Sequence, residues 1–236
     1  MTDITRTRVA AALGLLSIIV SFVGFVIHGY PAIGASGKEI AHWAITTDGQ
    51  RFAIGIYVEA LGLLLFLLFA AWLWSVARGA EDGSGWLATA GFGAATLYVG
   101  IGIMANGIWS SLLDGARHGT DPQTLASIRD IAEYIFHSTY LFVGLFLVCT
   151  GYVLVHSRAL PRWVGATAAV IGLGLLVPPL GDFPSLLLLL WTVVVSLYLL
   201  ARPSAVAKVR EPSAQRTPGP DEADHEDPSF LGVFRL

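Results

Sequence analysis

Charged residues are scarce in this sequence. Asp, Glu, Lys and Arg make up 13% of its 236 residues, against about 25% in an ordinary soluble domain. Apolar residues account for 55% and the mean hydropathy is +0.68. This balance excludes an ordinary soluble globular protein and indicates a membrane protein.

Cysteine and clustered basic charge are also nearly absent. A single residue, Cys149, can form neither an intrachain disulfide nor a thiolate metal cage. Lys and Arg total 14 against 17 Asp and Glu, with no dense basic run. The sequence therefore excludes a nucleic-acid partner.

The sequence contains several long apolar runs with few charged residues. A hydrocarbon core about 30 Å thick needs roughly 20 consecutive apolar residues in a helix. Six runs qualify, so the sequence predicts an all-α, polytopic membrane helix bundle with six transmembrane helices. The runs lie at about residues 9–30, 52–77, 86–109, 134–156, 162–180 and 185–201.

The segments outside the spans differ in composition. Residues 1–8 form a short N-terminus, and from Pro203 the chain is rich in Pro, Ser, Glu and Asp, which predicts a disordered tail over 202–236. Asp121 followed by Pro122 is typical of a helix start, so we expect the fourth helix to begin outside the membrane.

The positive charges are divided unevenly between the two sides of such a bundle. Ten of the 14 Lys and Arg residues fall on the side of the termini. The other four are Lys38, Arg51, Arg117 and Arg129. The positive-inside rule then places both termini in the cytoplasm, and we expect a multi-pass protein of a bacterial inner (plasma) membrane.

Small residues recur at helical spacing in the second, third and fifth spans, and the fifth supplies Ala168 and Gly172. Helices in lipid associate through such faces, so we expect contacts with membrane lipids and either a protein partner or a homo-oligomer through helices two and three. Helix two offers Gly55 and Gly62. Helix three offers Gly85, Thr89, Gly93, Thr96, Gly100 and Gly107.

One carboxylate lies well inside a span. Glu59 is about 10 Å inward from the outer end of the second helix. It shares a helical face with Gly55 and Gly62, so its side chain is expected to point at a neighbouring helix. An ionisable group at that depth is a functional hypothesis by default.

Other polar residues are expected in the same outer half of the bundle. Glu133 and His137 lie one above the other on the fourth helix, at i and i+4. The candidate ligand-binding residues are His28, Glu59, Asn106, Glu133, His137 and Tyr140.

Three interpretations of this set stay open. It can be a hydrogen-bonded network that fixes helix register, a pocket for a small molecule or lipid headgroup, or a site of metal or proton chemistry. A metal ion would take His28, Glu59, Glu133 and His137 as ligands. No cofactor is predicted, and haem is disfavoured because His156 has no partner histidine on the inner side. No catalytic residue can be named.

The turn between the fourth and fifth spans carries a recognisable run, Ser157-Arg158-Ala159-Leu160-Pro161-Arg162-Trp163. It resembles the cytoplasmic turn of a family of uncharacterised bacterial six-helix membrane proteins, domain of unknown function 4386. The resemblance extends over about residues 8–201 and to a carboxylate in the second helix, matched by Glu59. It implies architecture and membrane location, and no reaction.

This chain departs from that family at two places. The family often carries an Arg and a Glu in its third helix and a Glu in its sixth, where this sequence has the uncharged residues 90–95 and 186–190. The sequence favours a non-catalytic accessory or a small-molecule or lipid-binding membrane component. The alternative is a metal-dependent or proton-coupled enzyme or transporter that uses the outer Glu and His residues.

Overall fold

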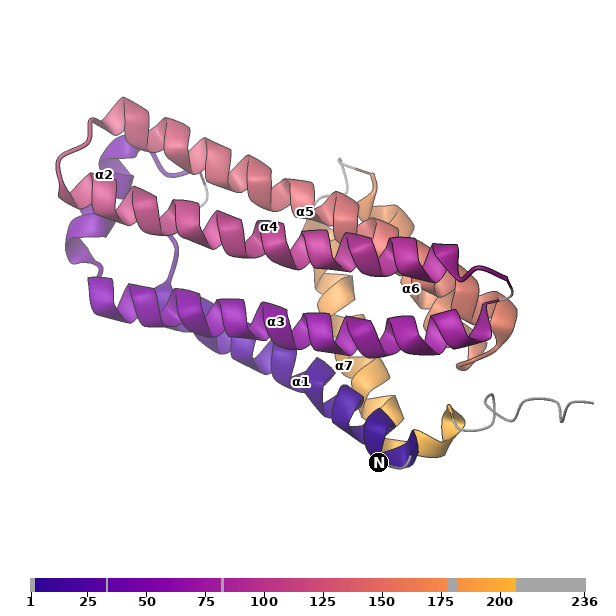
Figure 1. Ribbon diagram of the computed structural model, residues 1–236. Coiled ribbons are helices and arrows are strands. Elements are labelled where there is room, and N and C mark those ends of the chain that lie inside the picture. The colour runs from indigo at the N-terminus through magenta and orange to yellow at the C-terminus, as the bar shows by residue number, and fades with distance from the viewer. Residues whose placement is uncertain (1–2, 33, 82, 178–181, 207–236) are drawn as a thin grey trace, which may run out of the picture.

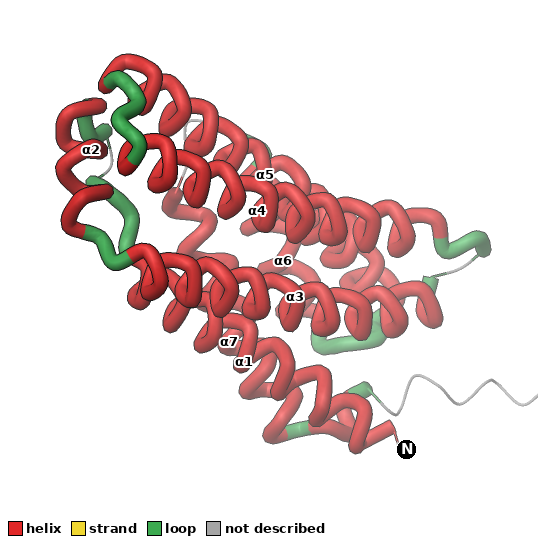
Figure 2. The backbone as a smooth tube through the Cα atoms, turned by 60° about the vertical axis from the view of Figure 1, so that its left-hand side comes forward, coloured by secondary structure: helices red, strands yellow, loops and turns green. Residues whose placement is uncertain are grey.

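The computed structural model describes residues 3–32, 34–81, 83–177 and 182–206, and every regular element within these ranges is a helix (Figure 2). Five helices are long: α1 (Asp3–His28), α3 (Gly49–Ala80), α4 (Trp86–Arg117), α5 (Pro122–Ser157) and α7 (Asp182–Ala201). Two are shorter, α2 (Gly37–Thr46) and α6 (Arg162–Leu175), and a single 3-10 turn, η2 (Pro203–Ala205), follows α7. The predicted tail beyond residue 206 lies outside the described residues.

The five long helices are each long and apolar enough to cross a membrane. The fifth predicted span, 162–180, is shorter than expected, because α6 has 14 residues and reaches about 21 Å at 1.5 Å per residue. Its end at Leu175 precedes Pro178-Pro179, and a proline disfavours helical backbone in the residue before it. Residues 178–181 themselves are outside the described ranges.

Both described ends of the chain lie at the same end of the bundle. Figure 1 shows the N-terminus, the end of α7 and the turns α3–α4 and α5–α6 together, with α2 and the α4–α5 connection at the opposite end. The Asp121 carboxylate accepts hydrogen bonds from the backbone N–H groups of Gln123 and Thr124, each at 3.0 Å. It therefore caps the start of α5, as the Asp121-Pro122 pair predicted. Helix α5 therefore begins well before its apolar run.

Close glycine contacts hold α1 against α3. A Cβ built on Gly24 would lie 2.7 Å from the carbonyl oxygen of Gly55, and one built on Gly55 would lie 2.6 Å from the backbone nitrogen of His28. Gly62 makes a similar approach to Ser21. The predicted small-residue face of the second span is thus filled by a helix of the same chain.

Close backbone contacts at glycines also hold α5 against α6. A Cβ on Gly144 would lie 2.9 Å from the carbonyl oxygen of Gly172, and one on Gly151 would lie 2.6 Å from that of Gly165. The two glycines on each helix are seven residues apart, which keeps them on one face. Helix α6 is therefore attached to α5 along its length.

Three of the glycines predicted to form a packing face on the third span do not contact another described helix. Among the described residues, no atom lies within 4 Å of a Cβ built on Gly93, Gly100 or Gly107 of α4, so no described helix packs on this face. Helix α4 contacts α5 through another face, where a Cβ on Gly91 would lie 3.1 Å from the Cβ of Cys149.

Helix α2 covers the end of the bundle opposite the termini and was not predicted. It begins with a capping box in which Glu39 N–H donates to the Ser36 hydroxyl and the Ser36 N–H donates to the Glu39 carboxylate. Arg117 of α4 donates to the carbonyls of Ala44 and Thr47 at its far end. Its buried side, Ile40 and Ala44, packs into an apolar cluster with α4 and α5.

Candidate functional site

Glu59 on α3 is the centre of a small hydrogen-bonded group. The Nε2 atom of His28 lies 2.7 Å from Glu59 Oε2, and the Tyr30 hydroxyl donates to the same oxygen at 3.2 Å. Tyr30 also lies 3.2 Å from the Asn106 Oδ1 atom on α4, so its single proton bridges the two oxygens. Three segments of the chain therefore meet at this carboxylate.

Two glycines, Gly24 and Gly29, position the side chains that meet at Glu59. Because Gly24 has no side chain, α1 approaches so closely that a Cβ there would lie 2.8 Å from the Glu59 Cα. Gly29 then ends α1 in a left-handed conformation, with φ +58°, as is common for the residue after a helix. That turn carries Tyr30 back over Glu59, and the Tyr30 ring lies 4.3 Å from the His28 ring.

The His28 side chain has no exposed surface, and its Nδ1 atom has no hydrogen-bond partner. A proton on Nδ1 would be an unsatisfied buried donor, which is costly. The structure therefore favours neutral His28 with its proton on Nε2, donated to Glu59. Within the described residues no Lys or Arg pairs with Glu59.

A cavity of about 440 Å³ begins at Glu59 and Asn106 and lies among α1, α3, α4, α5 and α7. Its lining reaches from Glu59 to Phe66 along α3 and from Asn106 to Tyr98 along α4. These stretches correspond to about 10–12 Å of helix, so the cavity extends along about two turns of α3 and α4.

The remainder of the cavity is apolar in effect. Five hydroxyls line the cavity, and two of them belong to Ser21 and Tyr98. The other three donate to carbonyls of their own helices: Ser17 to Gly14 at 2.7 Å, Thr139 to Phe136 at 2.6 Å and Thr192 to Leu188 at 2.9 Å. Their protons are thus already used. The other lining side chains are mostly aliphatic or aromatic, and the aromatic ones are Phe22, Phe25, Phe66, Tyr98 and Phe136.

Part of the lining also belongs to the outer surface of the bundle. Phe22 on α1, Phe136 on α5 and Leu186 on α7 are exposed by 65%, 44% and 61%. In a membrane these side chains would touch lipid, so the cavity communicates with the hydrocarbon region.

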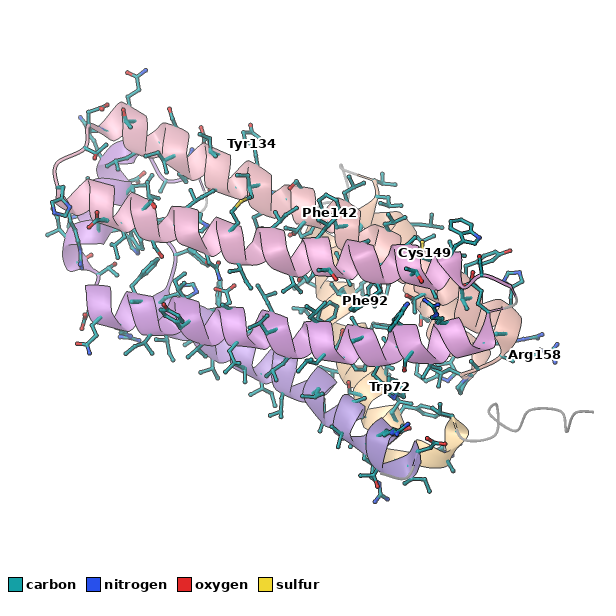
Figure 3. The ribbon with its side chains drawn as sticks, in the orientation of Figure 1. Trp72, Phe92, Tyr134, Phe142, Cys149 and Arg158 are labelled. Carbon is teal, nitrogen blue, oxygen red and sulfur yellow. The ribbon has the colours of Figure 1, made fainter. Side chains whose placement is uncertain are left out.

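The other predicted site residues lie elsewhere. His137 is exposed and three residues beyond Tyr134, which projects outward from α5 in Figure 3. Its Nδ1 atom is 2.7 Å from the carbonyl oxygen of Glu133, while the Glu133 carboxylate lies 3.7 Å from Arg129 Nε. Tyr140 stacks edge-on against Phe136 and His137. None of Glu133, His137 and Tyr140 lines the cavity.

Three of the six candidate residues are therefore brought together: His28, Glu59 and Asn106. The hypothetical metal set of His28, Glu59, Glu133 and His137 is not assembled, since the described residues contain no group of three or more His, Cys, Asp or Glu side chains able to hold a metal ion. Sequence reasoning missed Tyr30. The signal was Gly29, which marks a turn directly after His28.

A family model described as Domain of unknown function (DUF4386) matches residues 8–202. The matched range includes every residue that lines the cavity. Comparison with curated proteins and with solved structures found no match.

Proposed function

Because this chain belongs to the DUF4386 family, whose description names no activity, we propose its function from the cavity: a non-catalytic membrane component that binds one small apolar or lipidic molecule. The observation that carries this proposal is a cavity of about 440 Å³ with Glu59 and Asn106 at one end and an apolar remainder. Sites for small molecules have this composition, in which a few polar groups orient a ligand held by apolar contacts.

The membrane setting follows the same reasoning. A crossing by the shorter apolar helix α6, added to the five long helices, gives six, and an even number returns both ends to one side. The ten positive charges at that side against four at the other support cytoplasmic termini in a bacterial inner membrane. The Glu59 end of the cavity then lies in the outer half of the membrane.

A second candidate function is proton coupling. The 2.7 Å contact between His28 Nε2 and Glu59 Oε2 favours it, because two titratable groups share one proton there. A metal-dependent function has less support, since the four residues proposed as ligands are divided between the cavity end and the outer face of α5.

The cavity can be filled without touching its polar end. Gly102 lines the cavity, and a Cβ there would lie 3.1 Å from Leu63 Cδ1. Gly100, on the same helix, faces open space. Gly102→Leu therefore places a side chain in the cavity, and Gly100→Leu is the matched control on another face of α4.

The test uses the full chain in neutral lipid nanodiscs with dodecan-1-ol as the probe. Native mass spectrometry should find one bound probe on the natural protein and on Gly100→Leu, and at least tenfold lower occupancy on Gly102→Leu. Equal occupancy of all three proteins would show that the cavity is not the binding site, and no binding to any of them would overturn the proposal.

A further inference from the structure

We propose, resting on the proposed function above, that the ligand of this cavity is a cationic amphiphile, with a positively charged head at Glu59 and an apolar tail along α3 and α4. Nothing in the family description assigns a ligand. The inference depends on charge, on one free carboxylate oxygen and on the aromatic lining.

In the described part of the chain no cationic side chain would balance an ionised Glu59. Its described ionic partner is His28, whose buried and unpartnered Nδ1 favours the neutral form. The Glu59 side chain is only 17% exposed. An ionised carboxylate so placed lacks both the hydration of water and the attraction of a cation, which is costly within a membrane unless it takes up a proton or pairs with a cation from outside the chain. A positively charged ligand supplies what is missing.

One oxygen of Glu59 is available to such a ligand. His28 and Tyr30 both contact Oε2, and no hydrogen bond from the described part of the chain reaches Oε1. The carboxylate lines the cavity. A cation can therefore approach Oε1 without displacing either bond that holds the side chain in place.

Aromatic rings complete a site for a cation. Phe25 lines the cavity and packs against the rings of His28 and Tyr30, with centroids 5.9 and 5.7 Å away, so it lies beside the carboxylate. Phe22 and Phe136 also line the cavity. Aromatic faces attract organic cations, most strongly where water is excluded.

Other head groups fit less well. A fatty carboxylate would be repelled by Glu59, and a quinone carbonyl offers no proton or charge to it. An alcohol can donate one hydrogen bond to Oε1 but leaves the negative charge in place. The order of affinity should therefore be ammonium, then alcohol, then carboxylate.

The experiment compares three probes with the same tail: dodecyltrimethylammonium, dodecan-1-ol and dodecanoate. Each is added at equal mole fraction in neutral nanodiscs that hold the full chain, and native mass spectrometry measures occupancy. The natural protein should favour the ammonium over the alcohol by about tenfold, as expected for a hydrogen bond or ion contact that involves charge. Dodecanoate should bind most weakly.

Glu59→Gln keeps the shape of the side chain and removes its charge. In this variant the ammonium should lose its advantage and bind no more tightly than the alcohol. The ranking on the natural protein is a test that needs no substitution, and it stands even if the variant fails to fold.

The outcomes separate the two proposals. If Gly102→Leu excludes all three probes while the natural protein binds ammonium and alcohol equally, the cavity is the binding site and the charge inference is wrong. If the preference for ammonium persists in Glu59→Gln, the inference is wrong as well. If Gly102→Leu changes the binding of no probe, the proposed function itself fails.

Discussion

Gly24 of α1 and Gly55 of α3 face each other so closely that a single methyl group on Gly24 would lie 2.7 Å from the Gly55 carbonyl oxygen. The opposing atoms are backbone, so they cannot swing aside. This contact sets the separation of α1 and α3, and through it the distance between His28 and Glu59.

Gly24→Ala should therefore destabilise the bundle by about 1–3 kcal/mol, the usual cost of overpacking. Gly100→Ala is the matched control, because its Cβ meets nothing within 4 Å and alanine favours helix by up to about 1 kcal/mol over glycine. Unfolding in mixed micelles measures both. Equal stability of the two variants would contradict the close packing of α1 on α3.

Glu59→Gln should leave the free energy of unfolding unchanged or raise it by about 1 kcal/mol at neutral pH without added amphiphile. The amide can still accept from His28 and Tyr30, and the unbalanced buried charge is gone. The same unfolding assay applies. A large loss of stability would show instead that the charge is paired, which requires protonated His28.

Arg117→Ala should release α2 from the end of the bundle, because the guanidinium donates to the carbonyls of Ala44 and Thr47. Hydrogen exchange over residues 37–46 should become faster by at least several-fold. Lys38→Ala removes the same charge from an exposed position in α2. If both variants accelerate exchange equally, the contacts of Arg117 are not what holds α2.

The α2 capping box should weaken in acid. Hydrogen bonds with Ser36, from its backbone N–H first, lower the pKa of Glu39 from its ordinary value of 4.5. A lowered pKa in the folded state means that this stabilisation is complete above the ordinary value and is lost as pH falls through the lowered one. Protection of the first turn of α2, corrected for intrinsic exchange, should decline as the pH falls below the ordinary pKa of 4.5. Glu39→Gln should lack that decline.

The orientation can be tested with two neutral positions at opposite ends of the bundle. Gln50 and Ser84 are both exposed, so Gln50→Cys and Ser84→Cys each offer a thiol to a labelling reagent. The natural Cys149 is only 5% exposed and should react little. A membrane-impermeant maleimide should label Gln50→Cys in intact cells and Ser84→Cys only after permeabilisation. The reverse pattern would place the termini outside.

Much of the fold could be predicted from hydropathy. The apolar runs located α1, α3, α4, α5 and α7, and Asp121-Pro122 predicted the start of α5. Helix α2 was missed because ten residues of mixed polarity give no membrane signal, although Ser36 and Glu39 have the spacing of a capping box.

Which small residues meet could not be predicted. The glycines of α4 and those of α3 have similar spacing, yet Gly55 lies against α1 and Gly100 faces open space. Spacing shows that a helix can be approached closely and does not identify the neighbour. For the same reason the sequence proposed Glu133 and His137 beside Glu59, while the rotation of α5 turns His137 outward.

Three arginines bind main chain at the end of the bundle opposite the termini. Arg51 donates to the Ile27 carbonyl, Arg117 to those of Ala44 and Thr47, and Arg129 to that of Ala35. Each binds main chain at the end of the bundle opposite the termini, and under the proposed orientation each is a positive charge that crosses the membrane during insertion. Under the proposed orientation, replacing them would strengthen the charge asymmetry and weaken the cap at that end of the bundle, so the side chains that stabilise the fold there work against the orientation signal.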